Sequence, residues 1–176
     1  MSGSGPDRSG PDRSGPARGD GLHGHSWLRG RAVHPGAGTG ELLMLDDPLS
    51  FWGGTDHHGV IIDEHHPQHG ECLTGKVVAM RGARGSSSSS SVLAEQIRRG
   101  TAPAALILIE PDPILMVGAW AAAELYGHRL PIATLTERDY ASLPERTLAT
   151  VTVDSTMSHI TWQQGPADTE LPEVRT

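Results

Sequence analysis

The sequence predicts an α/β fold built on a parallel sheet. Between residues 76 and 126, short apolar runs alternate with runs of helical composition: KVVAM, VLAEQIRR, AALILIE and ILMVGAWAAAELYG. Strands and helices that alternate in this way favour right-handed crossovers onto one sheet, which gives a parallel βαβαβ unit. Two earlier apolar runs, WLRGRAV and ELLMLD, are joined by the glycine-rich HPGAGTG and predict an N-terminal β-hairpin that extends or caps that sheet.

The remaining elements follow from composition and from turn signals. PIATL at 131–135 predicts a third strand of the parallel sheet, and LATVTVD at 148–154 alternates as a fourth strand. Asp112 precedes Pro113, which is typical of a helix start, because the carboxylate accepts from free N–H groups and proline fits the first helical position. We therefore expect Asp112 to be a cap rather than a catalyst.

The chain length of 176 residues allows one ordinary domain. Residues 1–25 contain a repeated SGPDR unit, and their glycine, proline, serine and charge predict a disordered tail. Residues 26–160 are expected to form the folded domain. Residues 161–176 are polar and contain two prolines, which predicts a C-terminal tail.

Composition excludes several classes of protein. The formal net charge of −7 disfavours a nucleic-acid partner, whose phosphates an acidic surface repels. Cys72 is the single cysteine, so no internal disulfide is possible. The N-terminal sequence lacks the apolar stretch of a secretory leader, and Glu110 to Pro113 interrupt the apolar region around them. We expect a cytoplasmic protein with no membrane or nucleic-acid partner.

A serine loop is the most informative motif. Arg84 and Gly85 are followed by Ser86–Ser91, between a predicted strand and a predicted helix. The positive end of the helix dipole would stabilise an anion there, or a serine that becomes an alkoxide. A flexible serine linker is the alternative, but linkers do not usually separate two elements of such clear periodicity. The loop EPDP follows the next strand, so both loops should lie together at the carboxyl edge of the sheet.

Two other motifs offer competing sites. Five histidines lie in a short loop with acidic neighbours: His57, His58, His65, His66 and His69. Such a cluster could bind zinc or another divalent ion, or it could be a solvated, pH-sensitive loop, since its spacing is not that of a helical metal motif. The glycines of Gly36–Gly40 have the spacing of a nucleotide loop, but a strand rather than a helix follows them, which disfavours that function.

Four longer segments carry a family resemblance. They are PLSFWGGTD at 48–56, IIDEHHPQHGECLTGKVV at 61–78, RGSSSSSSVLAE at 84–95 and APAALILIEPDPILMVGAWAAAELYG at 102–127. Together they resemble the small, swivel-domain subunit of aconitase X enzymes, a family that includes the phosphomevalonate dehydratase small subunit and the corresponding part of bacterial cis-3-hydroxy-L-proline dehydratase. The resemblance covers about residues 28–154 in order, and several ungapped motifs together are more specific than any one of them.

The resemblance implies a swivelling β/β/α domain that closes over an active site lying mainly in a larger subunit. It also implies that the serine directly after the Arg-Gly pair, Ser86, is the proton acceptor of a dehydration. The sequence departs from the family pattern at Ser89, where the family often has glycine. If position 89 needs a positive φ, serine costs stability there or shifts the loop.

The chemistry of a dehydration gives the neighbouring residues candidate roles. Serine is a poor base in water, and it becomes usable only where a helix N-terminus, nearby hydroxyls and a cation favour its alkoxide. Ser87, Ser88 and Arg84 could supply these groups and bind substrate. Arg84 could pair in two-pronged fashion with a substrate carboxylate, or it could form a purely structural ion pair.

The segment PLSFWGGTD supplies a second group of candidates. Its two glycines allow close approach of backbone, and with the following carboxylate they are expected to border the cleft at the subunit junction and bind substrate: Gly53, Gly54 and Asp56. Phe51 and Trp52 are expected to plug the end of the sheet instead.

One cysteine is too few to hold an iron–sulfur cluster unaided, so any iron or iron–sulfur cluster must come from a partner, and we expect no metal bound by this chain. The resemblance implies that the partner is the large aconitase X subunit. The substrate would be a small hydroxy acid. Lys76 is the only lysine against many arginines, and Gly, Ala and Pro are abundant, which indicates a GC-rich bacterial gene. Such a source favours an amino-acid-derived substrate, cis-3-hydroxy-L-proline, with phosphomevalonate as the alternative. A non-catalytic module that binds an anion, or is phosphorylated, also remains open.

Overall fold

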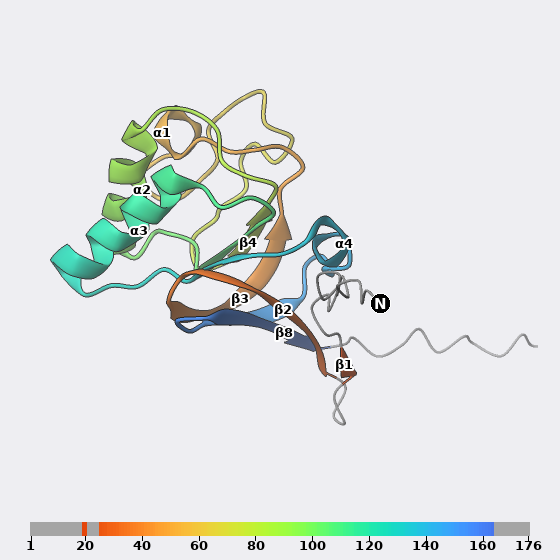
Figure 1. Ribbon diagram of the computed structural model, residues 1–176. Coiled ribbons are helices and arrows are strands. Elements are labelled where there is room, and N and C mark those ends of the chain that lie inside the picture. The colour runs from red at the N-terminus through yellow and green to blue at the C-terminus, as the bar shows by residue number, and fades with distance from the viewer. Residues whose placement is uncertain (1–18, 21–24, 164–176) are drawn as a thin grey trace, which may run out of the picture.

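The fold is known from a computed structural model, which describes residues 19–20 and 25–163 (Figure 1). Its strands are β1 (Gly19–Asp20), β2 (His25–His34), β3 (Gly36–Met44), β4 (Val77–Met80), β5 (Ala105–Leu108), β6 (Ile132–Thr134), β7 (Leu148–Val153) and β8 (Met157–Gln163). Its helices are α1 (Phe51–Gly54), α2 (Ser88–Arg99), α3 (Pro113–Tyr126) and α4 (Glu137–Tyr140).

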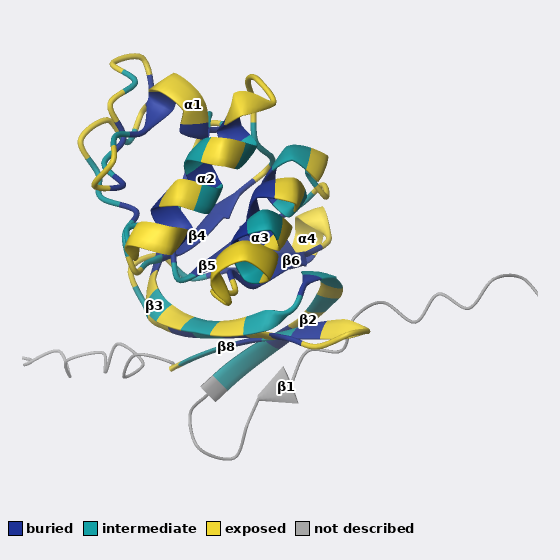
Figure 2. Ribbon diagram, turned by 90° about the vertical axis from the view of Figure 1, so that its left-hand side faces the viewer, coloured by how far each residue is buried: buried dark blue, intermediate teal, exposed yellow. Residues whose placement is uncertain are grey.

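The centre of the molecule is the predicted parallel sheet. β3, β4, β5 and β6 are parallel neighbours, with Leu106 of β5 opposite Val78 on one side and Ile132 on the other. β4 and β5 are buried at every position, as their continuous apolar runs predict. α2 and α3 pack on one face of this sheet, with exposed residues on their outer sides (Figure 2). The predicted βαβαβ unit is therefore confirmed.

The other face of the parallel sheet is covered by strands. β7 and β8 form an antiparallel pair, β7 bonds to β3, and β8 bonds to β2, which bonds in turn to β6. The sheet thus closes on itself around a second apolar cluster that includes Leu28, Ile107 and Ile160. Two strand layers and one helix layer give the β/β/α arrangement that the family resemblance implies.

The N-terminal strands differ in detail from the expectation. Only Pro35 separates β2 from β3, and the glycines of HPGAGTG lie inside β3 rather than in a connecting loop. A Cβ atom at Gly38 would collide with the carbonyl group of Ala104, and one at Gly40 with the carbonyl group of Gly75. These glycines therefore allow backbone to approach backbone. The chain crosses between the layers at Pro35, since β2 bonds to β6 and β8 while β3 bonds to β4 and β7.

The ends of the domain also differ from the expectation. β8 was not foreseen, and it continues to Gln163, beyond the boundary placed at residue 160. At the other end, Gly19 and Asp20 pair with Trp27 and Ser26 of β2. The rest of the two predicted tails, residues 1–18, 21–24 and 164–176, lies outside the described residues.

No helix among the residues described is both long and apolar enough to cross a membrane.

The close approach at Gly38 makes a testable prediction. Gly38→Ala is expected to lower the free energy of unfolding by about 1–3 kcal/mol, because the methyl group must push β3 away from the backbone of Ala104. Urea unfolding followed by circular dichroism measures the change. Gly82→Ala is the control, since a Cβ there meets nothing within 4 Å. Equal stability of the two variants would contradict the packing described for β3.

Candidate functional site

The serine loop leads from β4 into the first turn of α2. The helix begins at Ser88, earlier than the Val92 start that apolar periodicity predicts. Ser86 lies just before it and is exposed. Its Oγ accepts a hydrogen bond from the N–H of Ser88 at 3.2 Å, and its carbonyl oxygen accepts one from the N–H of Ser89 at 2.9 Å. The Ser86 hydroxyl therefore lies at the positive end of a 12-residue helix, as the sequence predicts.

Gly85 holds this loop against the segment that contains Ser50. Its φ of 102° lies in a region that glycine adopts easily, and a Cβ atom there would collide with the side chain of Ser50. The N–H of Arg84 donates to the carbonyl oxygen of Leu49 at 3.2 Å, and Leu49 forms an isolated parallel bridge with Ala83. The Arg84-Gly85 pair therefore packs the serine loop against the segment that contains Leu49 and Ser50.

Ser89 joins the two predicted site segments through its side chain. It is buried, with 1% of its surface exposed, and its Oγ accepts a hydrogen bond from the N–H of Trp52 at 3.1 Å. The Oγ of Ser50 lies 3.4 Å away and donates to the carbonyl oxygen of Trp52 at 2.7 Å. Ser89 lies within α2 and has no positive φ, so the strain considered for a non-glycine residue there does not arise.

Arg84 forms an ion pair with Asp63. The backbone N–H of His65 and the guanidinium of Arg84 hold the pKa of the Asp63 carboxyl below its usual range. Of the two roles weighed for Arg84, the structure shows the ion pair. Its side chain is still 48% exposed, so guanidinium N–H groups remain accessible, and a role in binding a substrate carboxylate stays a prediction.

The aromatic pair that precedes the glycines separates into two environments. Phe51 is fully buried in an apolar core cluster, which agrees with a packing role. Trp52 is 59% exposed, so the same expectation was wrong for Trp52. The physical reason is that Trp52 and Gly53 have non-helical angles inside α1, which interrupts the helix. Gly53 has a φ of 76° and is exposed, whereas Gly54 is buried against Leu49.

Asp56 shapes the loop that follows. One carboxylate oxygen accepts from the N–H groups of Val60 and His58, each at 2.9 Å, and these two bonds hold the pKa of Asp56 below its usual range. Asp56 borders a hollow of about 280 Å³ on the side of α2 that carries Ser91 and Gln96. No contact brings its carboxylate to the serine loop, and substrate binding by Gly53, Gly54 and Asp56 stays a prediction.

The histidine loop forms no metal centre among the residues that the structure describes, where no group of three or more His, Cys, Asp or Glu side chains is placed to hold an ion. His66 is buried, with its ring nitrogens near the carbonyl oxygen of Asp47 and the N–H of Gln68. The Cys72 thiol lies 3.9 Å from the carbonyl oxygen of His58. A single thiol in this setting does not fit an iron–sulfur cluster.

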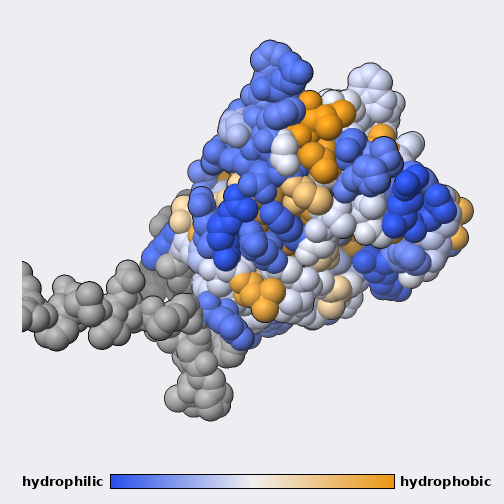
Figure 3. Space-filling model, turned by 180° about the vertical axis from the view of Figure 1, so that it is seen from behind, coloured by the Kyte–Doolittle hydropathy of each residue, from blue (hydrophilic) through white to orange (hydrophobic). Residues whose placement is uncertain are grey.

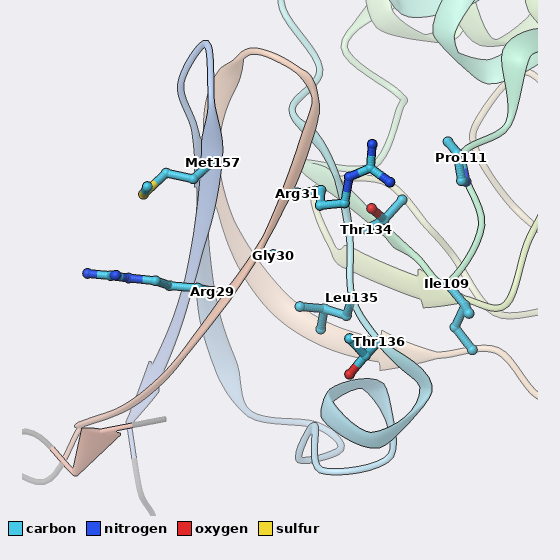
Figure 4. A pocket seen from close by; sticks show the side chains of 9 residues that line it. All are labelled: Arg29, Gly30, Arg31, Ile109, Pro111, Thr134, Leu135, Thr136 and Met157. Carbon is cyan, nitrogen blue, oxygen red and sulfur yellow. The ribbon is translucent and has the colours of Figure 1, made fainter. Parts of the chain in front are cut away.

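A cavity that the sequence did not reveal lies at the carboxyl edge of the parallel sheet, where β5 and β6 end (Figure 4). Its volume is about 440 Å³, and it is lined by Arg29, Gly30, Arg31, Ile109, Pro111, Thr134, Leu135, Thr136 and Met157. Arg31 extends over it beside Thr134, its partner in β6. The signal that could have found it is the pair of arginines two residues apart in a strand, but the pairing of β2 with β6 is not visible in the sequence.

The serine loop and the EPDP loop begin side by side, as expected. The carbonyl oxygen of Arg81 accepts from the N–H groups of Ile109 and Glu110, at 3.2 and 3.3 Å. Asp112 caps α3 as predicted, since its carboxylate accepts from the N–H groups of Ile114 and Leu115 and Pro113 is the first helical residue. The carboxyl edge of the sheet therefore carries both helix starts.

Comparison with known proteins identifies the family. Residues 27–161 match the family model described as the aconitase X swivel domain. The chain belongs to the aconitase X swivel-domain family. That match includes β3 to β7 in full and most of β2 and of β8.

The relatives of this swivel domain carry it in two forms. It is 49% identical over 122 residues to a cis-3-hydroxy-L-proline dehydratase of Pseudomonas aeruginosa, covering 68% of this chain but only 21% of that protein. It is 34% identical over 133 residues to a phosphomevalonate dehydratase small subunit of Methanocella arvoryzae, covering 73% of this chain and 93% of that one. The chain thus spans about a fifth of the length of the first relative and nearly all of the second.

A solved structure shows the same swivel fold. A crystal structure of Thermococcus kodakaraensis aconitase X in its holo-form superposes with a TM-score of 0.66 at 27% identity, covering 76% of this chain and 97% of that chain.

The Ser89 hydroxyl of the swivel domain provides the test of the site's geometry. Ser89→Ala is expected to lower the free energy of unfolding by about 1 kcal/mol or more, because the N–H of Trp52 loses its acceptor. Amide hydrogen exchange at Trp52 should become faster. Ser91→Ala, in the same helical turn but exposed, is the control and should change stability by less than about 0.5 kcal/mol. Unchanged exchange at Trp52 in Ser89→Ala would contradict this bond.

Proposed function

We propose that this chain is the small, swivel subunit of an aconitase-X-type hydro-lyase, which dehydrates a small hydroxy acid together with a metal-bearing large subunit. The observation that carries the proposal is the exposed hydroxyl of Ser86 at the positive end of α2, in a loop that Gly85 and Ser89 fix against a second segment. The dehydratases among the relatives support the reaction class, and the small-subunit relative supports a separate large partner.

In this proposal the alkoxide of Ser86 accepts the proton that the substrate loses, after a basic group of the large subunit has taken the proton of the hydroxyl. The N–H of Ser88 already donates to its Oγ, and that bond would strengthen as negative charge develops on the oxygen. A helix dipole at an exposed site contributes only about 0.3–1 kcal/mol. That is less than the value of one pKa unit, about 1.36 kcal/mol. The isolated chain therefore lacks a strong base, and water must be excluded from Ser86 before it acts.

The remaining candidate residues would position the substrate. Arg84 would bind its carboxylate with guanidinium N–H groups that are free of Asp63, and Ser87 and Ser88 are exposed beside it. Gly53 would allow substrate or partner backbone to approach, since a Cβ there meets nothing within 4 Å. An iron or iron–sulfur centre would be held by the large subunit and would supply the Lewis acid that the departure of hydroxide requires.

For the substrate we propose cis-3-hydroxy-L-proline. The support is the 49% identity over 122 residues to the Pseudomonas aeruginosa dehydratase, against 33–47% identity over 79–133 residues to phosphomevalonate dehydratase small subunits. Phosphomevalonate is the alternative substrate, and it would require a phosphate site in the assembled enzyme. A non-catalytic module that binds an anion at the serine loop is the alternative from another class.

Ser86→Ala tests the proposal. In the complex with the large subunit, kcat for cis-3-hydroxy-L-proline should fall by about 10²–10⁴-fold, the usual contribution of a general base. Assembly of the subunits should be unchanged, because the side chain is small and exposed. Ser91→Ala should retain activity, and it controls for the loss of a serine from this helix. Retained turnover in Ser86→Ala would remove Ser86 from the mechanism and favour the binding module.

A further inference from the structure

The exposure of Ser86 raises the question of what covers it. Two large apolar side chains are exposed on the segments that hold its loop, Trp52 at 59% and Ile62 at 46%. On the face shown in Figure 3, apolar residues form separate patches in a mainly hydrophilic surface, and α3 carries further exposed apolar side chains, among them Val117 and Leu125. Exposed aromatic and aliphatic side chains beside a site that must become dry are typical of an interface.

The backbone of Trp52 is held in place on both sides. Its N–H donates to Ser89 at 3.1 Å, and its carbonyl oxygen accepts from Ser50 at 2.7 Å. A side chain on a fixed backbone loses less entropy on binding than one on a mobile loop, so a partner gains more from covering it. Trp52 thus has the properties of a preformed binding hot spot next to the first turn of α2.

Ile62 is connected to the Trp52 segment by a backbone hydrogen bond. Its N–H donates to the carbonyl oxygen of Gly54 at 2.9 Å, which joins it to the glycines that follow Trp52. The next residue, Asp63, is the ion-pair partner of Arg84. These bonds place Trp52, Ile62 and the Arg84–Ser86 loop on neighbouring segments.

The segment that carries these two side chains is acidic, although Arg84 forms an ion pair with its Asp63, and Lys76 and Arg146 form ion pairs with its Glu71. Residues 46–71, which carry Trp52 and Ile62, contain six carboxylates and no lysine or arginine: Asp46, Asp47, Asp56, Asp63, Glu64 and Glu71. A partner that fits it would present an apolar socket surrounded by basic side chains. A second copy of this chain would place acidic groups against acidic groups, and its net charge of −7 adds to that repulsion.

The terminal segments of the chain do not have the required composition. Residues 1–18 contain no aromatic residue, leucine, isoleucine or valine. Residues 164–176 contain only Leu171 and Val174 as large apolar side chains, together with three carboxylates and a single arginine. Neither segment offers an apolar socket with a basic rim.

We propose that Trp52 and Ile62 form the docking surface for the large subunit, which receives Trp52 in an apolar socket with a basic rim and thereby excludes water from Ser86. This inference rests on the proposed function, because it supplies the partner that the function requires. It adds the residues that make the contact and the chemistry of the surface they meet.

The chain offers a matched control in Trp120. Its side chain is 54% exposed, close to the value for Trp52, but it lies in the middle of α3, near the exposed Val117 and Leu125. α3 is the other apolar surface that a partner could cover, and the two tryptophans distinguish the two surfaces.

Calorimetric titration of the full chain with the iron-bearing large subunit tests the proposal. Trp52→Ala is expected to weaken binding by about tenfold or more, and Trp52→Phe by less. Trp120→Ala is expected to stay within about twofold of the wild type. Higher NaCl concentration should slow association of the wild type, because it screens the acidic surface. Circular dichroism and urea unfolding confirm that each variant is folded.

The outcomes separate this inference from the function on which it rests. If Trp52→Ala is folded and binds like the wild type, the docking surface is wrong while the subunit assignment stands. If Trp120→Ala alone loses affinity, the large subunit covers α3 instead. If the wild-type chain binds no large subunit at all, the proposed function itself is contradicted. Weak binding of Trp52→Ala with normal binding of both Ser86→Ala and Trp120→Ala supports the inference.

Discussion

The hydrogen bond from the N–H of Trp52 to the buried hydroxyl of Ser89 is the interaction on which the site depends. It joins the start of α2 to the segment that follows β3, and these parts are far apart in the sequence. Gly85 packs against Ser50 at the same junction. Because both ends of the serine loop are held in this way, Ser86 is presented at the helix end in one defined place rather than on a mobile linker.

The helix dipole alone is too weak to make Ser86 a strong base, so in the proposed function a partner must contribute to its activation. A preorganised N–H group and a helix terminus place the hydroxyl and favour its charged form slightly, but an exposed oxygen keeps the competition of water. In the proposed function, the domain therefore carries a positioned but weak base. Covering it would strengthen the donor to Ser86 without any rearrangement, and in the proposed mechanism this gain must exceed the cost of removing the alkoxide from water. A swivelling subunit would suit the proposed chemistry, because closure onto the large subunit would cover Ser86 and activate it in one event.

The sequence predicted what depends on local patterns. Continuous apolar runs located β4 and β5, and Asp112 with Pro113 located the start of α3. It did not predict β8, whose polar residues become a strand only because β2 and β7 flank it, nor the exposure of Trp52, which depends on the angles at Gly53. The start of α2 at Ser88 was also not predicted, because the apolar periodicity begins only at Val92. Motif resemblance located Ser86, but only the fold shows that Ser89 braces it.

The most direct test of the central claim is a crystal structure of the chain bound to its large subunit and to cis-3-hydroxy-L-proline. The Ser86 oxygen should lie within about 3.5 Å of the substrate carbon that loses its proton, still accept the N–H of Ser88, and be shielded from bulk solvent. A structure in which Ser86 stays open to water, or in which the substrate lies in the cavity beneath Arg31, would contradict the claim that this hydroxyl becomes the base.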